Sequence, residues 1–462
     1  MILLLLICVT LAFFVANAVI AKYDYLNPAV VFCGLFLLYE IICLINVFAF
    51  RIEFHIETVA VLVVAFSIFT ILNIIFERHR EKGLIQESKP EIPFIHVSNV
   101  LVIGLIIFQV ITCVFFVVYL YQIADAFGTY DRSLGGVINL YDTLTKFWTT
   151  TFRELNVPIP MVYRVGNPIT TAGAYLIIYI AVNNFIARKR INPLHIISIF
   201  LLCVLIILNG SRSPLLRVFT MIIILLYILR CRKKREKRAT PQFFLKVMAA
   251  AFLFVILMVI VLSIMGRSEK TGELGKYLFI YTGAPIVNLD NYIYRNAIKL
   301  FGGQSEMFGA YTFQALYAYL GKLFGINQFI YPSISTFMFS NNGIEIGNVY
   351  TVFYKFIYDF GFFGVIPLTL IMALYYLYTY RKCMINPGKN PIDFRLFIYT
   401  YLFNDLVMSP FSCRFYETIL DAPFIKLLII SWLLNVVFIK KCLNFGDNTI
   451  RLTEFSSKRT VV

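Results

Sequence analysis

A series of apolar blocks separated by short polar turns constrains the fold of this chain more than any other feature. Each block is about 17 to 25 residues long, and a helix of that length crosses a hydrocarbon core of about 30 Å. The sequence is 60% hydrophobic and 14% charged, with a mean hydropathy of +0.80 over 462 residues. The blocks lack the period-two alternation of a membrane β-barrel, so only helices satisfy their backbone in lipid. We therefore predict an all-α polytopic membrane protein.

The blocks predict about eleven transmembrane helices, within a range of about ten to twelve. The predicted spans are residues 2–20, 29–50, 59–76, 100–121, 170–186, 194–208, 215–229, 243–265, 349–380, 394–411 and 425–439. Two long, more polar loops separate three groups of helices. The predicted parts are N-terminal helices (1–121), a first loop (122–167), central helices (168–265), a large and partly helical loop (266–347), and C-terminal helices with a short tail (348–462).

The basic residues set the expected orientation. They gather in residues 78–82, 188–190, 230–238, 381–382 and 440–441. All these clusters fall on one side of the alternating topology, and the positive-inside rule makes that side the cytoplasm. The C-terminus is then inside, and the N-terminus and both long loops are outside. Topology thus explains the formal net charge of +16 without nucleic acid. The first block lacks a basic leader and a cleavage site, so we expect it to remain as a span.

Two arginines interrupt the apolar sequence in NGSRSPLLR, residues 209–217. Gly210 and Pro214 predict a tight turn between two spans, at their outer ends. Arg212 lies in this turn, and Arg217 lies in the first turns of the next helix. Two guanidinium groups on the side normally poor in arginine indicate a bound anion, because the planar fork of arginine grips phosphate. The alternative is a plain turn whose arginine reaches lipid phosphates.

A second polar stretch is GNVYTVFYKFIYDFGFFG, residues 347–364. On a helix, one polar stripe would hold Asn348, Thr351, Lys355 and Asp359. Tyr350, Tyr354 and Tyr358 would form a neighbouring stripe. A helix from 348 to 380 would be about 50 Å long, so we expect a break near Gly361, Gly364 or Pro367. Ionisable residues within a membrane mark a functional site by default; the alternative is that the lysine and aspartate of the stripe only neutralise each other.

The start of the second long loop, residues 266–296, mixes cations, carboxylates and tyrosines suited to sugar hydroxyls and phosphate. Its candidate ligands are Arg267, Lys270, Tyr281, Asp290, Tyr292 and Arg295; an ordinary amphipathic loop is the alternative. Further along, Asn404 and Asp405 lie in an apolar block, where hydrogen bonding between helices explains the asparagine equally well.

Other catalytic groups are sparse. His55 and His96 are isolated near the ends of spans, His79 belongs to a basic inner turn, and His195 opens a span, so we expect no histidine-based mechanism. The nine cysteines form no CxxC pair, and the outer loops hold no carboxylate cluster at metal-ligand spacing. The sequence therefore predicts neither a metal site nor a cofactor.

The motifs taken together resemble the Wzy-type oligosaccharide repeat-unit polymerases, the O-antigen polymerase family of bacterial inner membranes. The resemblance rests on the GSRS turn (210–213), on GAPIVNLDNYI followed by FGG and YTF (283–313), and on GNVYT with DFG (347–364). It covers residues 194–380, while the first five spans match only as generic membrane helix. It implies a GT-C-like membrane glycosyltransferase in the bacterial inner membrane, with an extracytoplasmic active site and lipopolysaccharide or a similar surface polysaccharide as its product.

The family's reaction transfers a growing glycan from undecaprenyl pyrophosphate to the non-reducing end of a new lipid-linked repeat unit, without a metal. The resemblance implies that fixed cations match the charge of the leaving pyrophosphate and that a carboxylate receives the acceptor proton. The expected catalytic residues are Arg212, Arg267, Asp290 and Asp359. The expected substrate-binding residues are Arg217, Lys270, Tyr281, Arg295, Asn348, Tyr350, Thr351, Tyr354 and Lys355. Expected partners are lipid-linked oligosaccharides, membrane lipids, a chain-length regulator and a flippase.

Three other functions stay open at this stage. An O-antigen ligase also has many spans, a large outer loop and arginines for pyrophosphate, although residues 266–347 lack the histidine expected of a ligase loop. A flippase or another transporter would distribute polar residues through the membrane depth. A membrane scaffold would have little use for Lys355 and Asp359.

Overall fold

The computed structural model describes residues 1–82, 92–128, 131–234, 241–264, 274–296, 298–329, 335–385, 390–440, 442–445 and 448–451. This part of the chain is almost wholly helical. The helices are α1 (Ile2–Ile20), α2 (Pro28–Ile45), α3 (Ile56–Lys82), α4 (Asn99–Phe127), α5 (Leu134–Lys146), α6 (Thr149–Glu154), α7 (Met161–Arg188), α8 (Pro193–Leu208), α9 (Ser213–Lys234), α10 (Pro241–Ile264), α11 (Leu274–Thr282), α12 (Ala284–Arg295), α13 (Gln314–Phe324), α14 (Phe353–Phe360), α15 (Val365–Ile385), α16 (Phe394–Val407), α17 (Arg414–Ile419) and α18 (Ala422–Asn435). Two short antiparallel pairs, β1 (Met338–Phe339) with β2 (Glu345–Gly347) and β3 (Cys442–Phe445) with β4 (Asn448–Arg451), are its strands.

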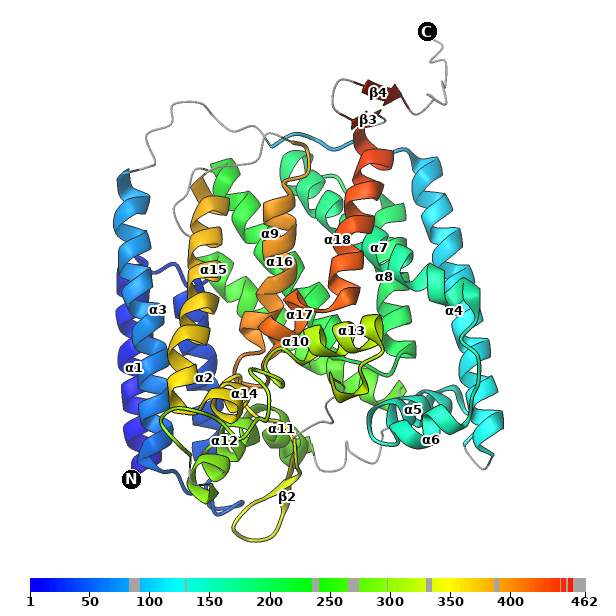
Figure 1. The fold of residues 1–462 in the computed structure, drawn as a ribbon. Coiled ribbons are helices and arrows are strands. Elements are labelled where there is room, and N and C mark those ends of the chain that lie inside the picture. Colours follow the sequence, from blue (N-terminus) through cyan, green and yellow to red (C-terminus); the bar gives the residue numbers. More distant parts are fainter. Residues whose placement is uncertain are drawn as a thin grey trace. The chain divides into compact units, whose positions relative to one another are not determined.

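The chain forms two compact units. The first comprises residues 1–90, 219–387 and 395–424, and the second comprises residues 91–218, 388–394 and 425–462. In the first unit, α1, α2, α3 and α15 pack side by side (Figure 1). Aromatic rings fill the contact between α2 and α3, where Phe32 stacks on Phe69 with ring centroids 4.1 Å apart. At one end of this group, α11 and α12 contact α2, and α12 also contacts α3.

The other end of the first unit is closed by polar side chains. Asp24, in the turn between α1 and α2, accepts hydrogen bonds from the hydroxyls of Tyr227 and Tyr380. Arg232 Nε donates to the carbonyl oxygen of Cys383 over 2.6 Å. These bonds tie α9 and α15 to each other and to the first turn of the chain. A buried carboxylate and guanidinium are tolerated there because each has a partner.

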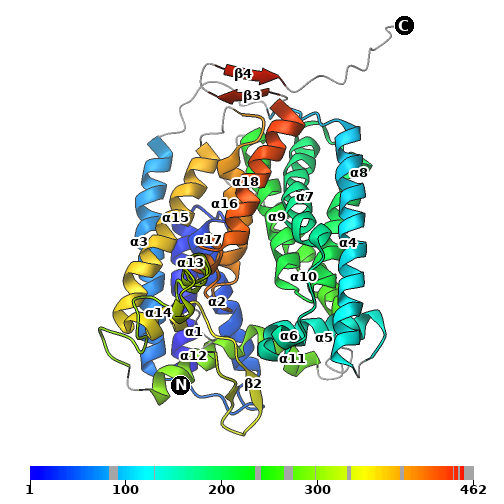
Figure 2. The same ribbon diagram turned by 45° about the vertical axis from the view of Figure 1, so that its right-hand side comes forward.

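In the second unit, α4, α7 and α8 pack against one another, and α5 and α6 lie across one end of α4 (Figure 2). Tyr163, near the start of α7, stacks on Phe116 of α4 with ring centroids 4.2 Å apart. The Tyr163 hydroxyl donates to the side-chain oxygen of Asn209 over 2.8 Å. This bond connects the first long loop region to the turn that precedes α9.

The prediction of an all-α membrane protein is confirmed, whereas the count of eleven spans is not. In the described ranges, eight helices are long and apolar enough to cross a membrane. They are Ile2–Ile20, Pro28–Ile45, Ile56–Arg78, Asn99–Phe127, Met161–Arg188, Ser213–Lys234, Phe362–Met384 and Ala422–Ile439. Two of the remaining predicted spans correspond to shorter apolar helices, α8 with 16 residues and Leu245–Met258 within α10. The third corresponds to α16, which has 14 residues.

The predicted helix from residue 348 to residue 380 is wrong at its start. Residues 348–351 are not helical, and α14 begins only at Phe353. The cause is tertiary: Asn288 Nδ2 donates to the carbonyl oxygen of Val349 over 2.8 Å, and the Val352 amide donates to the carbonyl oxygen of Ser409 over 2.8 Å. The single polar stripe predicted here therefore does not exist, because its first two residues precede the helix.

A break is confirmed, and it lies at Gly361, the first of the three predicted positions. Gly361 ends α14 with φ 69° and ψ −166°, a conformation essentially restricted to glycine. After it, a 3-10 turn (Phe362–Gly364) leads into α15. A β-carbon at this position would lie 2.4 Å from the carbonyl oxygen of Lys299. The break therefore depends on the absence of a side chain.

We expect Gly361→Ala to lower the free energy of unfolding by about 1 to 3 kcal/mol, because it adds backbone strain and a steric contact. The measurement is the apparent melting temperature of the purified protein in detergent. Gly275→Ala is the control, since a β-carbon there meets nothing within 4 Å. A Gly361→Ala protein as stable as this control would contradict the interpretation.

Candidate functional site

The helix α12 is the central element of the candidate site, and two of its faces carry polar side chains. Asn288, Tyr292 and Arg295 are spaced at three and four residues, so they share one face. Asp290 and Tyr294 share another face, roughly opposite. The helix begins at Ala284 beside Pro285, which suits the first turn of a helix because its missing N–H has no intrahelical partner there. The two faces belong to two separate side-chain clusters.

The first face contributes to a tyrosine cluster that consists of Tyr292, Tyr311, Tyr350, Tyr354 and Tyr358. Tyr350 stacks on Tyr354 with ring centroids 4.1 Å apart and an interplanar angle of 14°. Tyr292 meets the edge of Tyr354 at 4.7 Å, and Tyr311 meets Tyr358 at 4.9 Å. The members come from α12, α14 and two loop segments. Aromatic rings tipped with hydroxyls suit the apolar faces and polar edges of sugars.

One hydroxyl of the tyrosine cluster is buried without a partner. Tyr292 is 5% exposed, and its hydroxyl has no hydrogen-bond partner within the described ranges. Burial raises the pKa of Tyr292, and the nearby Tyr358, Tyr350 and Asp359 raise it further. The group therefore stays protonated and can donate to a ligand oxygen. An unpaired buried hydroxyl costs about 1 to 3 kcal/mol, so its presence indicates a role in binding.

A cation lies beside this cluster. Arg295, in the last turn of α12, is exposed. Burial raises the pKa of the Tyr350 hydroxyl, while a hydrogen bond to Thr336 and the charge of Arg295 oppose that rise. The guanidinium therefore lies close enough to Tyr350 for its field to act on the hydroxyl. The structure brings the predicted residues Arg295, Tyr350 and Tyr354 together.

Asp359, at the end of α14, is bound to backbone amides. Its carboxylate accepts from the amide of Thr312 over 2.5 Å and from the amide of Tyr311 over 3.3 Å. Burial raises its pKa, and these hydrogen bonds oppose the rise. The amide of Gln304 also donates to the carbonyl oxygen of Tyr358 over 2.7 Å. Asp359 thereby fixes the segment that carries Tyr311 in the tyrosine cluster.

Lys355 does not pair with Asp359, so the simple neutralisation considered as an alternative is wrong. Lys355 Nζ lies 2.8 Å from Glu417 Oε1 and donates to Gln314 over 3.2 Å. Arg414 binds the other oxygen of Glu417 over 3.3 Å. Two cations thus share one carboxylate, and a net positive charge is left. Such a group can hold an anionic ligand.

The second face of α12 forms a histidine–aspartate pair that the sequence did not indicate. Asp290 Oδ2 lies 2.7 Å from His55 Nδ1, and Asp290 Oδ1 accepts from the His55 amide over 2.9 Å. Tyr294 stacks on the imidazole with ring centroids 3.6 Å apart. Burial raises the pKa of Asp290, while the hydrogen bonds from the amide and the ring of His55 oppose the rise. The expectation that His55 is isolated is therefore wrong.

No sequence signal linked these two residues, because 235 positions separate them. Composition and helical periodicity describe neighbours along a helix, not a contact between the start of α3 and a distant loop helix. The carboxylates around His55 in RIEFHIET were the only local sign, since they mark the segment as polar and close to the boundary of a span.

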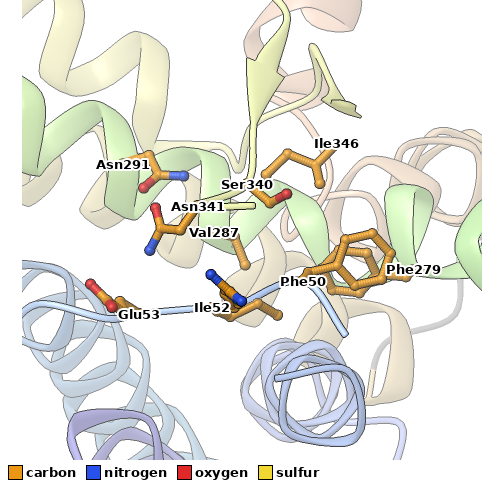
Figure 3. Close-up of a pocket in the computed structure, with 10 residues that line it drawn as sticks. Phe50, Ile52, Glu53, Phe279, Val287, Asn291, Ser340, Asn341 and Ile346 are labelled. Atoms are coloured by element: carbon orange, nitrogen blue, oxygen red, sulfur yellow. The ribbon is translucent and has the colours of Figure 1, made fainter. Parts of the chain in front are cut away.

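A small pocket lies next to the pair. Phe50, Arg51, Ile52, Glu53, Phe279, Val287, Asn291, Ser340, Asn341 and Ile346 line it. Figure 3 shows the amides of Asn291 and Asn341 near the carboxylate of Glu53, with the rings of Phe50 and Phe279 at the other end. Its empty volume of about 220 Å³ includes open solvent and is smaller than a pocket for a drug-sized ligand. It can receive the edge of a larger ligand.

The turn with the two predicted arginines belongs to the second unit. Gly210 has φ 71°, and a β-carbon there would lie 2.7 Å from Asp142 Cβ of α5. The predicted tight turn is thus present and packs closely on α5. Arg212 lies in the turn, Arg217 lies in α9, and both are half-buried. Arg217 thus lies within a helix that is long and apolar enough to span a membrane.

The other predicted site residues lie in several places. Tyr281 of α11 stacks on Phe411 with ring centroids 6.0 Å apart. Thr351 is buried, and its hydroxyl accepts from the amide of Phe353 over 3.4 Å at the start of α14. Asn348 is half-buried. Arg267 and Lys270 lie outside the described residues.

In the described ranges, no three His, Cys, Asp or Glu side chains gather in a way that could hold a metal ion. The paired cations at Glu417 and the guanidinium of Arg295 are instead the groups suited to an anion. Comparison with known proteins adds no relative: no known protein family, curated protein or solved structure matches this chain.

We expect Tyr292→Phe to leave the melting temperature unchanged or to raise it, because the buried hydroxyl that it removes has no protein partner. Tyr416→Phe is the matched control. Its hydroxyl donates to the carbonyl oxygen of Leu368 over 2.7 Å, so its loss should cost about 1 kcal/mol. A Tyr292→Phe protein less stable than Tyr416→Phe would contradict the assignment of the hydroxyl to a ligand.

Proposed function

We propose that this protein is a membrane glycosyltransferase that polymerises lipid-linked oligosaccharide repeat units. It transfers a growing glycan from undecaprenyl pyrophosphate to the non-reducing end of a new lipid-linked unit. The reaction takes place at the outer face of the bacterial inner membrane and uses no metal. The product is an O-antigen or a similar surface polysaccharide.

The tyrosine cluster beside a cation is the observation that carries this proposal. Five tyrosines gather in a helical membrane protein from segments between apolar helices, and one of their hydroxyls lacks a protein partner. A saccharide ligand uses both properties, because its ring faces stack on aromatic rings and its hydroxyls need donors. The exposed Arg295 adds the positive charge that a lipid-linked phosphate requires.

The cations have the task of binding the leaving group. As the anomeric bond breaks, negative charge grows on the pyrophosphate, and fixed guanidinium groups stabilise it without reorganisation. In the first unit, Lys355 and Arg414 share Glu417, and Arg295 is exposed. Arg212 and Arg217, in the second unit, are two further guanidinium groups suited to a phosphate. The free energy for transfer is already stored in the bond between sugar and lipid phosphate, so no nucleotide sugar takes part.

The test of the reaction class is reconstitution of the purified protein in liposomes with an undecaprenyl-pyrophosphate-linked repeat unit. A ladder of longer lipid-linked glycans is expected, and it should persist in EDTA. A polymer that moves to lipid A–core acceptors without lengthening would indicate a ligase. Movement of single units between leaflets would indicate a transporter. Either outcome would replace the proposed reaction.

We expect Arg212→Lys to lower the polymerisation rate by about 10- to 100-fold, because lysine keeps the charge and loses the bidentate fork. Ladder formation by equal amounts of reconstituted protein measures this rate. Arg188→Lys is the control, since Arg188 ends α7 within a basic cluster assigned to the cytoplasmic side. Full-length polymer at the normal rate from Arg212→Lys would show that this arginine does not clamp pyrophosphate.

A further inference from the structure

We infer that His55 is the general base that removes the proton from the acceptor hydroxyl, and that Asp290 positions it. This inference rests on the proposed function, and it replaces the carboxylate base expected from the sequence. The geometry of the pair, its accessibility and its neighbours each support it.

Two hydrogen bonds fix the imidazole. Asp290 is fully buried, and its two oxygens separately bind the His55 amide and ring nitrogen Nδ1. The amide can only donate, which favours the ionised carboxylate as acceptor. Nδ1 then carries the proton, and the lone pair of the neutral ring lies on Nε2. A buried carboxylate that orients a histidine tautomer in this way is the arrangement found in hydrolytic triads.

The other ring nitrogen is available. The imidazole is 23% exposed, and Nε2 has no hydrogen-bond partner among the residues that the structure describes. Tyr294 covers one ring face at 3.6 Å with an interplanar angle of 12°, so the ring is held between the stack and the carboxylate. A positioned, unprotonated nitrogen that opens to solvent is what a general base requires.

The surroundings suit a saccharide acceptor. Glu53 and Asn291 of the small pocket are two residues before His55 and one residue after Asp290. Their carboxylate and amide can bind sugar hydroxyls. The other titratable groups near the imidazole are Tyr294 from α12 and the exposed Glu57 from its own segment. The pocket also contains a cation, Arg51, whose charge is accompanied by the carboxylate of Glu53.

The proposed step balances as follows. His55 Nε2 takes the proton of the acceptor hydroxyl, whose oxygen bonds to the anomeric carbon of the donor glycan. The bond between that carbon and the pyrophosphate oxygen breaks, and undecaprenyl pyrophosphate leaves with the electron pair. The carboxylate of Asp290 stabilises the imidazolium. The proton then passes to the released pyrophosphate or to water, which restores the base.

The experiment measures kcat and KM for lengthening of the undecaprenyl-pyrophosphate-linked unit between pH 5 and pH 9. We expect His55→Gln to lower kcat by about 100-fold or more, with little change in KM. His96→Gln, an exposed histidine of the second unit, should match the wild type.

Two further variants separate catalysis from folding. Added imidazole should restore part of the rate to His55→Ala, and a purely structural histidine would not respond in this way. Asp290→Asn should lower kcat with little change in KM, because the asparagine NH2 donates to Nδ1 and leaves the ring proton on Nε2, the nitrogen that must act as the base. Should His55→Gln fold poorly, the imidazole response of His55→Ala decides the matter.

The outcomes separate the two proposals. A wild-type protein that lengthens glycans, together with a His55→Gln protein that matches it at every pH, overturns the role of His55 and leaves the proposed function intact. A slower His55→Gln protein, together with no response of His55→Ala to added imidazole, also overturns it. A wild-type protein that lengthens no glycan overturns the proposed function and the base assignment together.

Discussion

The arrangement of the candidate site depends on the buried polar bonds that hold α12 in place. The Asn288 amide binds the carbonyl oxygen of Val349 on one side, and Asp290 binds His55 on another. Leaving such groups buried and unpaired would cost about 1 to 3 kcal/mol each, and more for the charged one. The two bonds therefore fix the rotation of the helix about its axis. That rotation decides that Tyr292 joins the tyrosine cluster while Tyr294 stacks on the imidazole.

The same constraint explains the polar residues within the apolar helices of the first unit. Lipid offers no hydrogen-bond partner, so a polar side chain in a span must find one on another helix. Asn17 and Asn73 bind each other over 3.0 Å, and Thr10 binds Glu40 over 2.9 Å. These pairs join α1 to α3 and to α2. They hold helices together, whereas the proposed base and the tyrosine cluster lie in segments between the spans.

The periodicity and the length of the apolar blocks predicted the class of fold and most of the spans. They could do so because a helix in lipid needs a long run of apolar residues, which is visible in the sequence. They also predicted a break near Gly361, Gly364 or Pro367 from the excess length of the helix. They failed for residues 348–351, where bonds to Asn288 and Ser409 override a helical pattern. Those partners come from two other parts of the chain, so the local sequence does not indicate them.

The predicted site residues likewise include some that the sequence could identify and others that it could not. Tyr350, Tyr354 and Arg295 could be chosen by residue type, since aromatic and cationic side chains in polar segments are suited to a glycan phosphate. The ion pair of Lys355 could not be predicted by residue type, because a complete span separates this lysine from its partner Glu417 in the sequence. Helical spacing suggested Asp359 instead, and that residue is occupied by backbone amides.

Asp290 and Asp359 look alike in the sequence, but their surroundings give them different chemistry. The oxygens of Asp359 accept hydrogen bonds from backbone amides, which neither gain nor lose a proton. The carboxylate therefore only anchors a loop segment. Asp290 instead binds a ring whose second nitrogen can gain a proton, so its charge becomes more stabilising when that proton arrives. Burial makes the difference larger, because Coulomb interactions strengthen as water is excluded. Asp290 can therefore assist proton transfer by acting through His55. Asp359 cannot, because its oxygens are bound to backbone amides that do not take part in proton transfer.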